Sequence, residues 1–211
     1  MNLADGVAVR VSALCLAPDG HLSGRLLASD AVRGALLLDL ALSGRLTSTE
    51  ESIVIDPSPT GFDPADRLLA AITAESERSL DGWLGERRIG LRDVAEANSA
   101  SGRWERRPGL LGLRPRYTDR QRDRTDRDLA RRSSDWPGDT TAADACVTAL
   151  AGASGLLDPA HGLAEPPAAH VLASAGPVAW LCTAVTEYLE AAGRRYRVEA
   201  GTLSGGAIGP F

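Results

Sequence analysis

The chain has 211 residues, of which 44% are hydrophobic and 4% aromatic, and its formal net charge at pH 7 is −5. This composition fits one globular domain with an aliphatic core. The absence of any run of about 18 apolar residues argues against a membrane-spanning helix, and the N-terminus lacks the pattern of a secretory signal.

Cysteine use and the distribution of charge are both uneven. Cys15, Cys146 and Cys182 form no CxxC pair, which is typical of a reduced cytosolic protein with buried thiols. Between Arg87 and Arg132 there are 14 arginines against 7 acidic residues, and the remainder holds 9 arginines against 21 acidic residues. A basic segment on an acidic chain predicts a directed electrostatic surface. The alternative is that the charges of this segment pair along helices and cancel.

The N-terminal part predicts a turn between two apolar segments. Residues 5–16 fit either a helix or a strand, and the resemblance described below favours a short helix. Residues 18–21, Pro-Asp-Gly-His, predict a turn. Residues 29–47 then form the most strongly patterned stretch of the chain. We expect a helix there with Asp30 as its N-cap and Gly44 at the left-handed position that ends it.

This central helix is apolar on more than one face, which predicts that it is buried among other helices. Two charged residues, Arg33 and Asp39, interrupt the pattern. An unpaired charge is costly to bury, so one interpretation places both side chains at the solvated rim. The other interpretation is that Arg33 faces an anion.

The middle of the chain predicts a hairpin and two helices. Residues 45–56 contain two short β-branched runs around Glu50-Glu51, which indicates a small hairpin. Asp63-Pro64 predicts the N-cap and first residue of a helix to about Glu77. Ser79 predicts the cap of a short helix to Arg87, with Trp83 pointing inward.

The basic segment predicts a helix at residues 91–101, ending at Gly102, and then a hairpin at residues 103–117 with Pro108-Gly109 at its tip. Residues 118–132 are almost wholly charged and too poor in apolar side chains to bury a face. They predict a solvated helix or a mobile connector.

The C-terminal part predicts two further helices. Residues 140–157 are amphipathic, with Asp139 as the cap, and residues 158–175 are weakly specified. The last helix opens at Pro177 and ends at Gly193. The chain is therefore expected to be a single domain over residues 1–193, followed by a loosely held tail over residues 194–211.

Motifs of enzymes and metal sites are missing. There is no hydrolase nucleophile elbow, nucleotide-binding loop, dinucleotide fingerprint or zinc-protease motif, and the three histidines lack metal-ligand spacing. The acidic residues that could hold Mg²⁺ are each flanked by arginine: Asp119, Asp123, Asp126 and Asp128. We therefore predict no catalytic residue, metal or cofactor.

Three stretches, in order and with matching spacing, resemble one family. Residues 32–46, VRGALLLDLALSGRL, are similar to the G-x-L-L-x-E-L-A-L-R-G-R-L helix of the Golgi phosphoprotein 3 family. Residues 56–61, DPSPTG, followed by Leu68-Leu69, are similar to its D-x-x-P-T-G-D-x-x-L segment, and residues 79–84, SLDGWL, are similar to its S-x-x-x-W-I/L helix start. The resemblance extends from about Val9 to Ala192. It implies a mainly α-helical single domain around a central buried helix, with short β-hairpins.

The resemblance also implies a ligand. Eukaryotic members bind phosphatidylinositol 4-phosphate at the membrane and help to retain glycosyltransferases in the Golgi. Their headgroup pocket uses a Trp before the central helix, an Arg in the first turn of that helix, and two Arg three residues apart on a later helix. Arg33 matches the first Arg. The later pair falls at Arg88 and Leu91, of which Arg88 matches and Arg92 lies one residue away, and Gly24 stands at about the Trp position.

The hairpin predicts an interaction surface. Leu110, Leu111 and Leu113 lie beside several arginines of the hairpin, and an apolar tip in a basic collar suits an interfacial membrane contact. The alternatives are that these leucines pack on the same molecule or on another subunit, which would make a homo-oligomer.

Taken together, these observations predict a cytoplasmic, peripherally membrane-associated protein. It would bind anionic lipid headgroups at Arg33, Arg88 and Arg92 and could act as an adaptor, with no role in nucleic-acid binding or catalysis. The alternative is a helical enzyme or binding protein for a phosphorylated small molecule.

Overall fold

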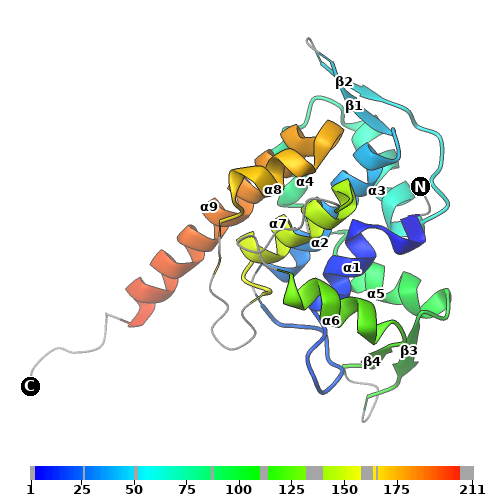
Figure 1. Cartoon of the computed structure of the whole chain (residues 1–211), viewed down its shortest axis with the longest axis vertical. Helices are drawn as coiled ribbons and strands as arrows, with labels where there is room; N and C mark the ends of the chain where they lie inside the picture. The colour runs from blue at the N-terminus through cyan, green and yellow to red at the C-terminus, as the bar shows by residue number, and fades with distance from the viewer. Residues whose placement is uncertain are drawn as a thin grey trace, which may run out of the picture.

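The computed structural model describes residues 3–25, 27–49, 52–86, 88–109, 114–131, 140–157, 164 and 166–204. Over these residues the protein is mainly helical with two small antiparallel two-stranded sheets, as expected (Figure 1). The elements in chain order are a 3₁₀ turn Leu3–Asp5, α1 Val7–Leu14, α2 Ala28–Leu42, β1 Leu46–Ser48, β2 Ile53–Ile55, α3 Asp63–Ala74, α4 Leu80–Leu84, α5 Leu91–Ala100, β3 Trp104–Arg107, β4 Arg116–Asp119, α6 Arg122–Ala130, α7 Ala142–Ala153, α8 Ala169–Ser174, a 3₁₀ turn Gly176–Val178 and α9 Ala179–Ser204.

Helix α2 lies at the centre of the molecule, in contact with α1, α3, α5, α7 and α9 (Figure 1). Most of its apolar side chains are buried, including those of Val32, Leu36, Leu37 and Leu40, and only Ala41 and Leu42 at its C-terminal end are partly buried. The predicted organising role of this helix is therefore confirmed. Gly34 marks its closest approach to α9, because a Cβ atom there would overlap Val185.

The C-terminal end of α2 was predicted correctly, but its start was not. Gly44 has φ +75°, its N–H donates to the carbonyl of Ala41 at 3.0 Å, and the Arg45 N–H donates to that of Leu40 at 2.8 Å. This pair of bonds is the Schellman arrangement. The helix begins at Ala28, so Asp30 lies inside its first turn rather than at the N-cap.

The expectation that Arg33 and Asp39 lie at a solvated rim is wrong for both. Asp39 is fully buried, and its carboxylate accepts hydrogen bonds from the N–H groups of Val7 at 2.7 Å and Ala8 at 2.9 Å. The side chain thus caps the N-terminus of α1 from the neighbouring helix, where free amide hydrogens need an acceptor. A Cβ atom at Gly6 would lie 2.5 Å from the carboxylate oxygens, so the close approach requires glycine there.

The last helix does not end at Gly193. Helix α9 continues to Ser204 and extends away from the rest of the molecule in Figure 1. Gly193 is instead a packing position, because a Cβ atom there would lie 3.3 Å from a methyl group of Leu27. A single glycine weakens a helix interior by only about 1 kcal/mol, so it does not by itself end one.

Other helix boundaries differ by a few residues from the prediction. Helix α3 has Phe62 as its N-cap and ends at Ala74, and α4 is capped by Ser79 as expected but ends at Leu84. Helix α7 is capped by Thr141, whose Oγ1 accepts from the N–H of Asp144 at 3.2 Å. The predicted cap Asp139 lies outside the described residues. Within the weakly specified stretch the chain forms the short helix α8.

The two hairpins lie at opposite ends of the molecule (Figure 1). The β1–β2 hairpin pairs Leu46 with Ile55 and leaves Ile53 and Val54 half exposed, at 51% and 52%. The β3–β4 hairpin forms where it was predicted, but β4 runs beyond Tyr117 to Asp119. Trp104 and Tyr117 pack against each other on its inner face, with ring centroids 5.7 Å apart.

Helix α6 is held to the core by polar contacts. The buried side chains on this helix are Thr125 and Asp128. Asp128 accepts two hydrogen bonds from the buried Arg10 of α1, from Nη2 at 2.6 Å and from Nε at 2.9 Å. Arg10 also reaches Asp144 of α7 at 2.7 Å. The segment is therefore helical and only partly solvated.

Within the described residues, no helix has the length and apolar character that crossing a bilayer requires.

Candidate functional site

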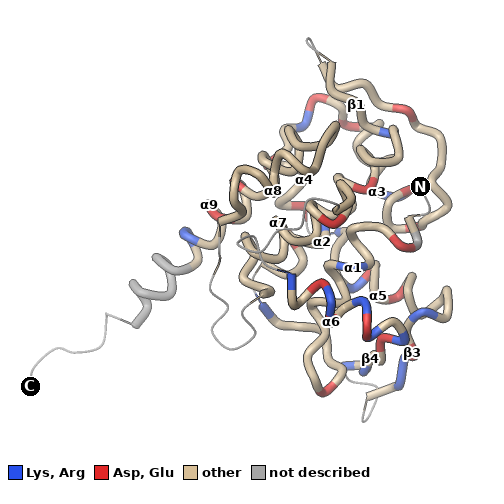
Figure 2. Tube along the Cα trace, viewed as in Figure 1, with Lys and Arg blue, Asp and Glu red and all other residues tan. Residues whose placement is uncertain are grey.

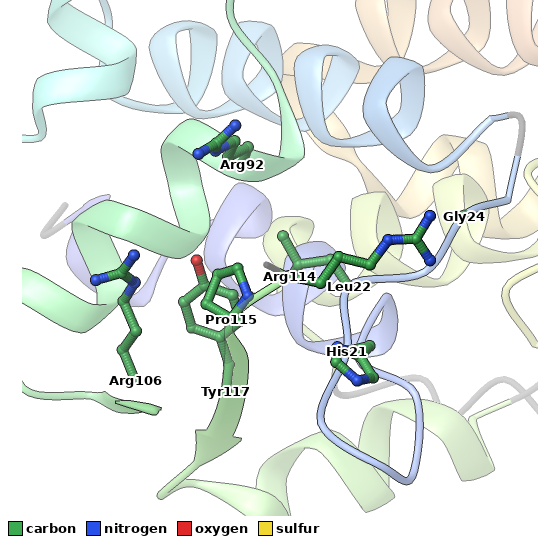
Figure 3. Close-up of a pocket in the computed structure, with 8 residues that line it drawn as sticks. All are labelled: His21, Leu22, Gly24, Arg92, Arg106, Arg114, Pro115 and Tyr117. Carbon is green, nitrogen blue, oxygen red and sulfur yellow. The ribbon is translucent and has the colours of Figure 1, made fainter. Parts of the chain in front are cut away.

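Positive charge gathers at the end of the molecule formed by α6 and the β3–β4 hairpin, where Figure 2 shows arginines in blue. An open cavity of about 440 Å³ lies at this end. We call it the basic cavity; its lining residues, drawn in Figure 3, are His21, Leu22, Gly24, Arg92, Arg106, Arg114, Pro115 and Tyr117.

Three elements position the arginines of the basic cavity. Arg92 is in the first turn of α5, Arg106 is in β3, and Arg114 precedes β4. The register of the hairpin places Arg106 directly opposite Tyr117. Since side chains alternate along a strand, both lie on the face that Trp104 packs against the body. The cavity therefore opens between the hairpin, α5 and the segment that contains His21 and Gly24 (Figure 3).

The turn at residues 17–21 contributes His21 to the basic cavity. It is the predicted turn, with Gly20 at φ +83° and its N–H donating to the carbonyl of Ala17 at 2.8 Å. The N–H of Tyr117 donates to the carbonyl of Gly20 at 2.7 Å, and Nε of Arg116 donates to Nε2 of His21 at 3.3 Å. These bonds fix His21 beside the hairpin.

Charge in the basic cavity is of one sign, since no Asp or Glu is among its described lining residues. The side chains of Arg92, Arg106 and Arg114 are exposed. Arg92 is paired with Glu96 at 3.2 Å along its own helix, and Arg106 and Arg114 have no ion-pair partner in the described part of the chain. Such a site suits an anion, because guanidinium groups form charge-assisted, bidentate hydrogen bonds with phosphate.

A second hollow, of about 430 Å³, lies between the hairpin and the turn at residues 17–20, and Tyr117 lines it as well. Arg107, Arg116 and Arg122 line it, but so do Asp19 and Asp119. The two carboxylates offset most of the positive charge, so this hollow is the weaker candidate for an anion.

Arg33 lies outside the basic cavity. Its side chain is 2% exposed, its Nε donates to the carbonyl of Ile89 at 2.9 Å, and its Nη1 contacts Asp30 at 3.0 Å and the carbonyl of Leu84. The arginine thus holds the segment between α4 and α5 against α2. It sits in the second turn of α2, away from the free amide hydrogens of the first.

The structure does not bring Arg33, Arg88 and Arg92 into one site. Arg88 projects into solvent with 87% of its side chain exposed and lies 3.9 Å from a carboxylate oxygen of Glu86. Arg92 lines the basic cavity, whereas Arg33 and Arg88 do not. The predicted hairpin leucines, Leu110, Leu111 and Leu113, lie outside the described residues.

Reasoning from the sequence missed Tyr117 and His21 as residues of the site. Strand alternation from Trp104 could have placed Arg106 and Tyr117 on one face of the hairpin. The neighbourhood of His21 could not be found in this way, because it depends on a contact with a strand almost a hundred residues later.

The thiols and the described acids elsewhere are not arranged as a nucleophile or a metal site. All three cysteines are buried, as predicted. A hydrogen bond with Cys182, together with burial, raises the pKa of Cys146, and burial raises the pKa of Cys15 to about 12. A thiol with a raised pKa is a poor nucleophile. Among the described residues, no three His, Cys, Asp or Glu side chains are grouped so that they could hold a metal ion.

The family model described as Golgi phosphoprotein 3 (GPP34) matches residues 14–192, which is most of the chain. No curated protein matches the chain.

Proposed function

The chain belongs to the Golgi phosphoprotein 3 family, and we propose that it is a peripheral membrane protein that binds anionic lipid headgroups in the basic cavity. The observation that carries this proposal is that Arg92, Arg106 and Arg114 line one open cavity whose described lining contains no carboxylate. The family is known for binding phosphatidylinositol 4-phosphate at membranes, and a headgroup of this kind is the proposed ligand.

The strength of binding follows from charge. Each basic residue near an anionic membrane surface contributes about 1 kcal/mol, and the attraction falls off within a Debye length. Binding should therefore weaken steeply with salt. Gly24 lines the cavity with open space above it, so the cavity lacks the apolar wall that a Trp would supply there, and we expect poor discrimination among anionic headgroups.

The three arginines named from the sequence have separate proposed roles. Arg92 contacts the headgroup directly. Arg88 is exposed in the segment that precedes α5 and adds positive charge that attracts the anionic membrane surface. Arg33 acts indirectly, because its hydrogen bond to the carbonyl of Ile89 holds the backbone between α4 and α5 in place.

The hairpin is the proposed membrane-contacting element. In the sequence, Leu110, Leu111 and Leu113 fall between β3 and β4, and Arg114 of the basic cavity follows directly. Insertion of these leucines would bring the cavity to the headgroup layer. Association of two chains through residues 103–117, and a role as an adaptor at the cytoplasmic face of a membrane, are further parts of the proposal.

Sedimentation with vesicles tests the proposal. Phosphatidylcholine vesicles with and without phosphatidic acid, phosphatidylglycerol or phosphatidylinositol 4-phosphate would be compared over a range of salt concentrations. The Arg92→Ala, Arg106→Ala, Arg114→Ala triple variant should bind anionic vesicles roughly a hundred times more weakly, at about 1 kcal/mol per charge.

A second triple variant controls for net charge alone. Arg78→Ala, Arg194→Ala and Arg195→Ala remove the same charge from the connection between α3 and α4 and from α9, outside the cavity, and should bind almost as the wild type does. An equal loss of vesicle binding in both triple variants would show that net positive charge attracts the protein to the membrane without a specific site in the basic cavity. A wild type that ignores anionic vesicles and binds a soluble phosphate compound would favour the alternative, a binding protein or enzyme for a phosphorylated small molecule.

A further inference from the structure

Tyr117 lies in the wall of the basic cavity with an unused hydrogen-bonding group. Its side chain is 2% exposed, and its hydroxyl has no hydrogen-bond partner in the described part of the chain. In Figure 3 the hydroxyl end of the ring points toward the side of the cavity from which Arg92 enters. A buried tyrosine hydroxyl normally finds a partner, so its isolation here needs an explanation.

His21 contributes a second unused group to the same cavity. Its Nε2 accepts a hydrogen from Nε of Arg116, so the neutral imidazole carries its own hydrogen on Nδ1. That Nδ1 is buried and has no partner among the described residues. Two unsatisfied donors, the Tyr117 hydroxyl and His21 Nδ1–H, therefore belong to residues that line one cavity.

Arg114 adds backbone strain at the same place. It is the one residue other than glycine with positive φ in the described chain, at +45°. A bulky side chain in this conformation is unfavourable and persists only where the surrounding structure holds it, which is common at ligand sites. The unsatisfied Tyr117 hydroxyl, the unsatisfied His21 Nδ1 and the strained backbone of Arg114 all destabilise the fold and all belong to residues that line the basic cavity. A ligand bound in the cavity would explain all three.

We propose that Tyr117 is the specificity-determining residue of the basic cavity, with its hydroxyl donating a hydrogen bond to a phosphate oxygen of the anion that Arg92, Arg106 and Arg114 attract. The inference rests on the proposed function for the identity of the site. Arg106 stands opposite Tyr117 in the hairpin. Its side chain is exposed, has no ion-pair partner among the residues that the structure describes, and can fold onto a phosphate.

The arginine side chains and the Tyr117 hydroxyl act on an anion over different distances. Attraction by guanidinium groups acts over a Debye length and is screened by salt, so it does not distinguish a charged surface from a ligand inside the cavity. A hydrogen bond from a neutral hydroxyl acts only at contact distance. Tyr117 thereby selects anions that place a phosphate oxygen within the cavity, either a projecting lipid headgroup or a free phosphate compound.

The test is Tyr117→Phe, with Tyr188→Phe on α9 as the matched control outside the cavity. Phenylalanine keeps the ring that packs on Trp104 and removes only the hydroxyl. Binding would be measured with phosphatidylcholine vesicles containing phosphatidic acid at several salt concentrations, and with inorganic phosphate by the shift in melting temperature. The melting temperature of each unliganded variant would be recorded as well.

We expect Tyr117→Phe to weaken vesicle binding about tenfold, the typical effect of losing one hydrogen bond to a charged group. The loss should be the same at every salt concentration, whereas Arg114→Ala should reduce the salt dependence. Because the hydroxyl is unsatisfied in the unliganded protein, its removal should leave the melting temperature unchanged or raised. If the hydroxyl had only a structural role, its removal would lower the melting temperature.

The outcomes separate this inference from the proposed function. Unchanged vesicle binding by Tyr117→Phe, or a loss accompanied by a lower melting temperature, would overturn the role of Tyr117 and leave the lipid proposal intact. A wild type that ignores vesicles but is stabilised by phosphate, with Tyr117→Phe insensitive to phosphate, would support the inference and overturn the lipid proposal. A wild type that binds neither probe would overturn both.

Discussion

Nε of Arg33 donates to the backbone carbonyl of Ile89 at 2.9 Å, and this bond ties the central helix to the segment immediately before α5. A residue that the family resemblance assigns to the headgroup is thereby also a buried support for the backbone that carries Arg92. The two roles differ in what a substitution does to the folded protein without any ligand.

Replacing Arg33 should therefore affect folding first. Arg33→Ala leaves the carbonyls of Ile89 and Leu84 without their donor, and we expect a loss of about 3 kcal/mol in the free energy of unfolding. Arg33→Lys should also destabilise, because an ammonium group cannot reproduce the fork of donors. Chemical denaturation measures both, and Arg88→Ala, at an exposed position, is the control that should change stability by less than about 0.5 kcal/mol.

Helix α6 should depend on one buried carboxylate. Asp128→Ala removes the bidentate partner of Arg10, whose side chain is 5% exposed, and leaves Asp144 as its remaining partner. The loss should be about 3 kcal/mol, because a buried ion pair is broken. Asp126→Ala on the same helix breaks only the exposed pair with Arg122 and should cost less than about 1 kcal/mol. Equal effects of the two substitutions on urea unfolding would contradict the polar anchoring of α6.

The pH dependence of stability should contain a contribution from Asp39. Burial raises the pKa of this carboxyl from 3.8 to about 7, although the N–H groups of Ala8 and Val7 oppose the shift. Between these values the folded state holds a proton that the unfolded state has lost, so the free energy of unfolding should fall as the pH rises from about 4 to about 7. Asp39→Asn should flatten this part of the curve, as measured by thermal unfolding at each pH.

Asp144 should make the free energy of unfolding rise with pH, in a lower pH range than Asp39. Burial raises the pKa of Asp144, but hydrogen bonds from Thr141 and Arg10 outweigh it and lower the pKa from 3.8 to about 2. Its contribution is therefore complete above 3.8 and should be lost as the pH falls toward 2. Asp144→Asn should remove this acid-side loss while leaving the slope between pH 4 and 7 intact, which makes the two variants controls for each other.

Gly24 offers a gain-of-function test. A Cβ atom there meets nothing within 4 Å, and the residue lines the basic cavity. Gly24→Trp should supply the missing apolar wall and strengthen binding to anionic vesicles about fivefold, corresponding to roughly 1 kcal/mol for an aromatic face beside a bound headgroup. Gly24→Ala should bind as the wild type does. No gain in the tryptophan variant would show that a headgroup does not reach this side of the cavity.

Local signals predicted those parts of the fold whose cause is local. Gly44 ends α2 and Gly102 follows the end of α5, both at positive φ, because glycine alone tolerates that conformation without strain. The all-round apolar pattern of α2 correctly indicated a buried helix. Ser79 was recognisable as a cap because its hydroxyl needs an amide only three residues away.

Contacts between distant residues account for what was missed. The partners of Asp39 are amides 31 and 32 residues earlier, and no pattern around position 39 reveals them. Gly193 resembles a helix stop unless the nearby side chain of Leu27 is known. In the candidate site, the basic hairpin was predictable, whereas the position of His21 beside it depends on the hydrogen bond from the Tyr117 N–H to the Gly20 carbonyl.

The opposite placement of the two hairpins gives the molecule a polarity (Figure 1). With the β3–β4 end lying on a bilayer, the β1–β2 hairpin stands at the full length of the protein away from the lipid, with Ile53 and Val54 facing water. These side chains then cannot serve as a lipid anchor, and the spacing sets how far from the membrane a second macromolecule would be held if it engaged that end.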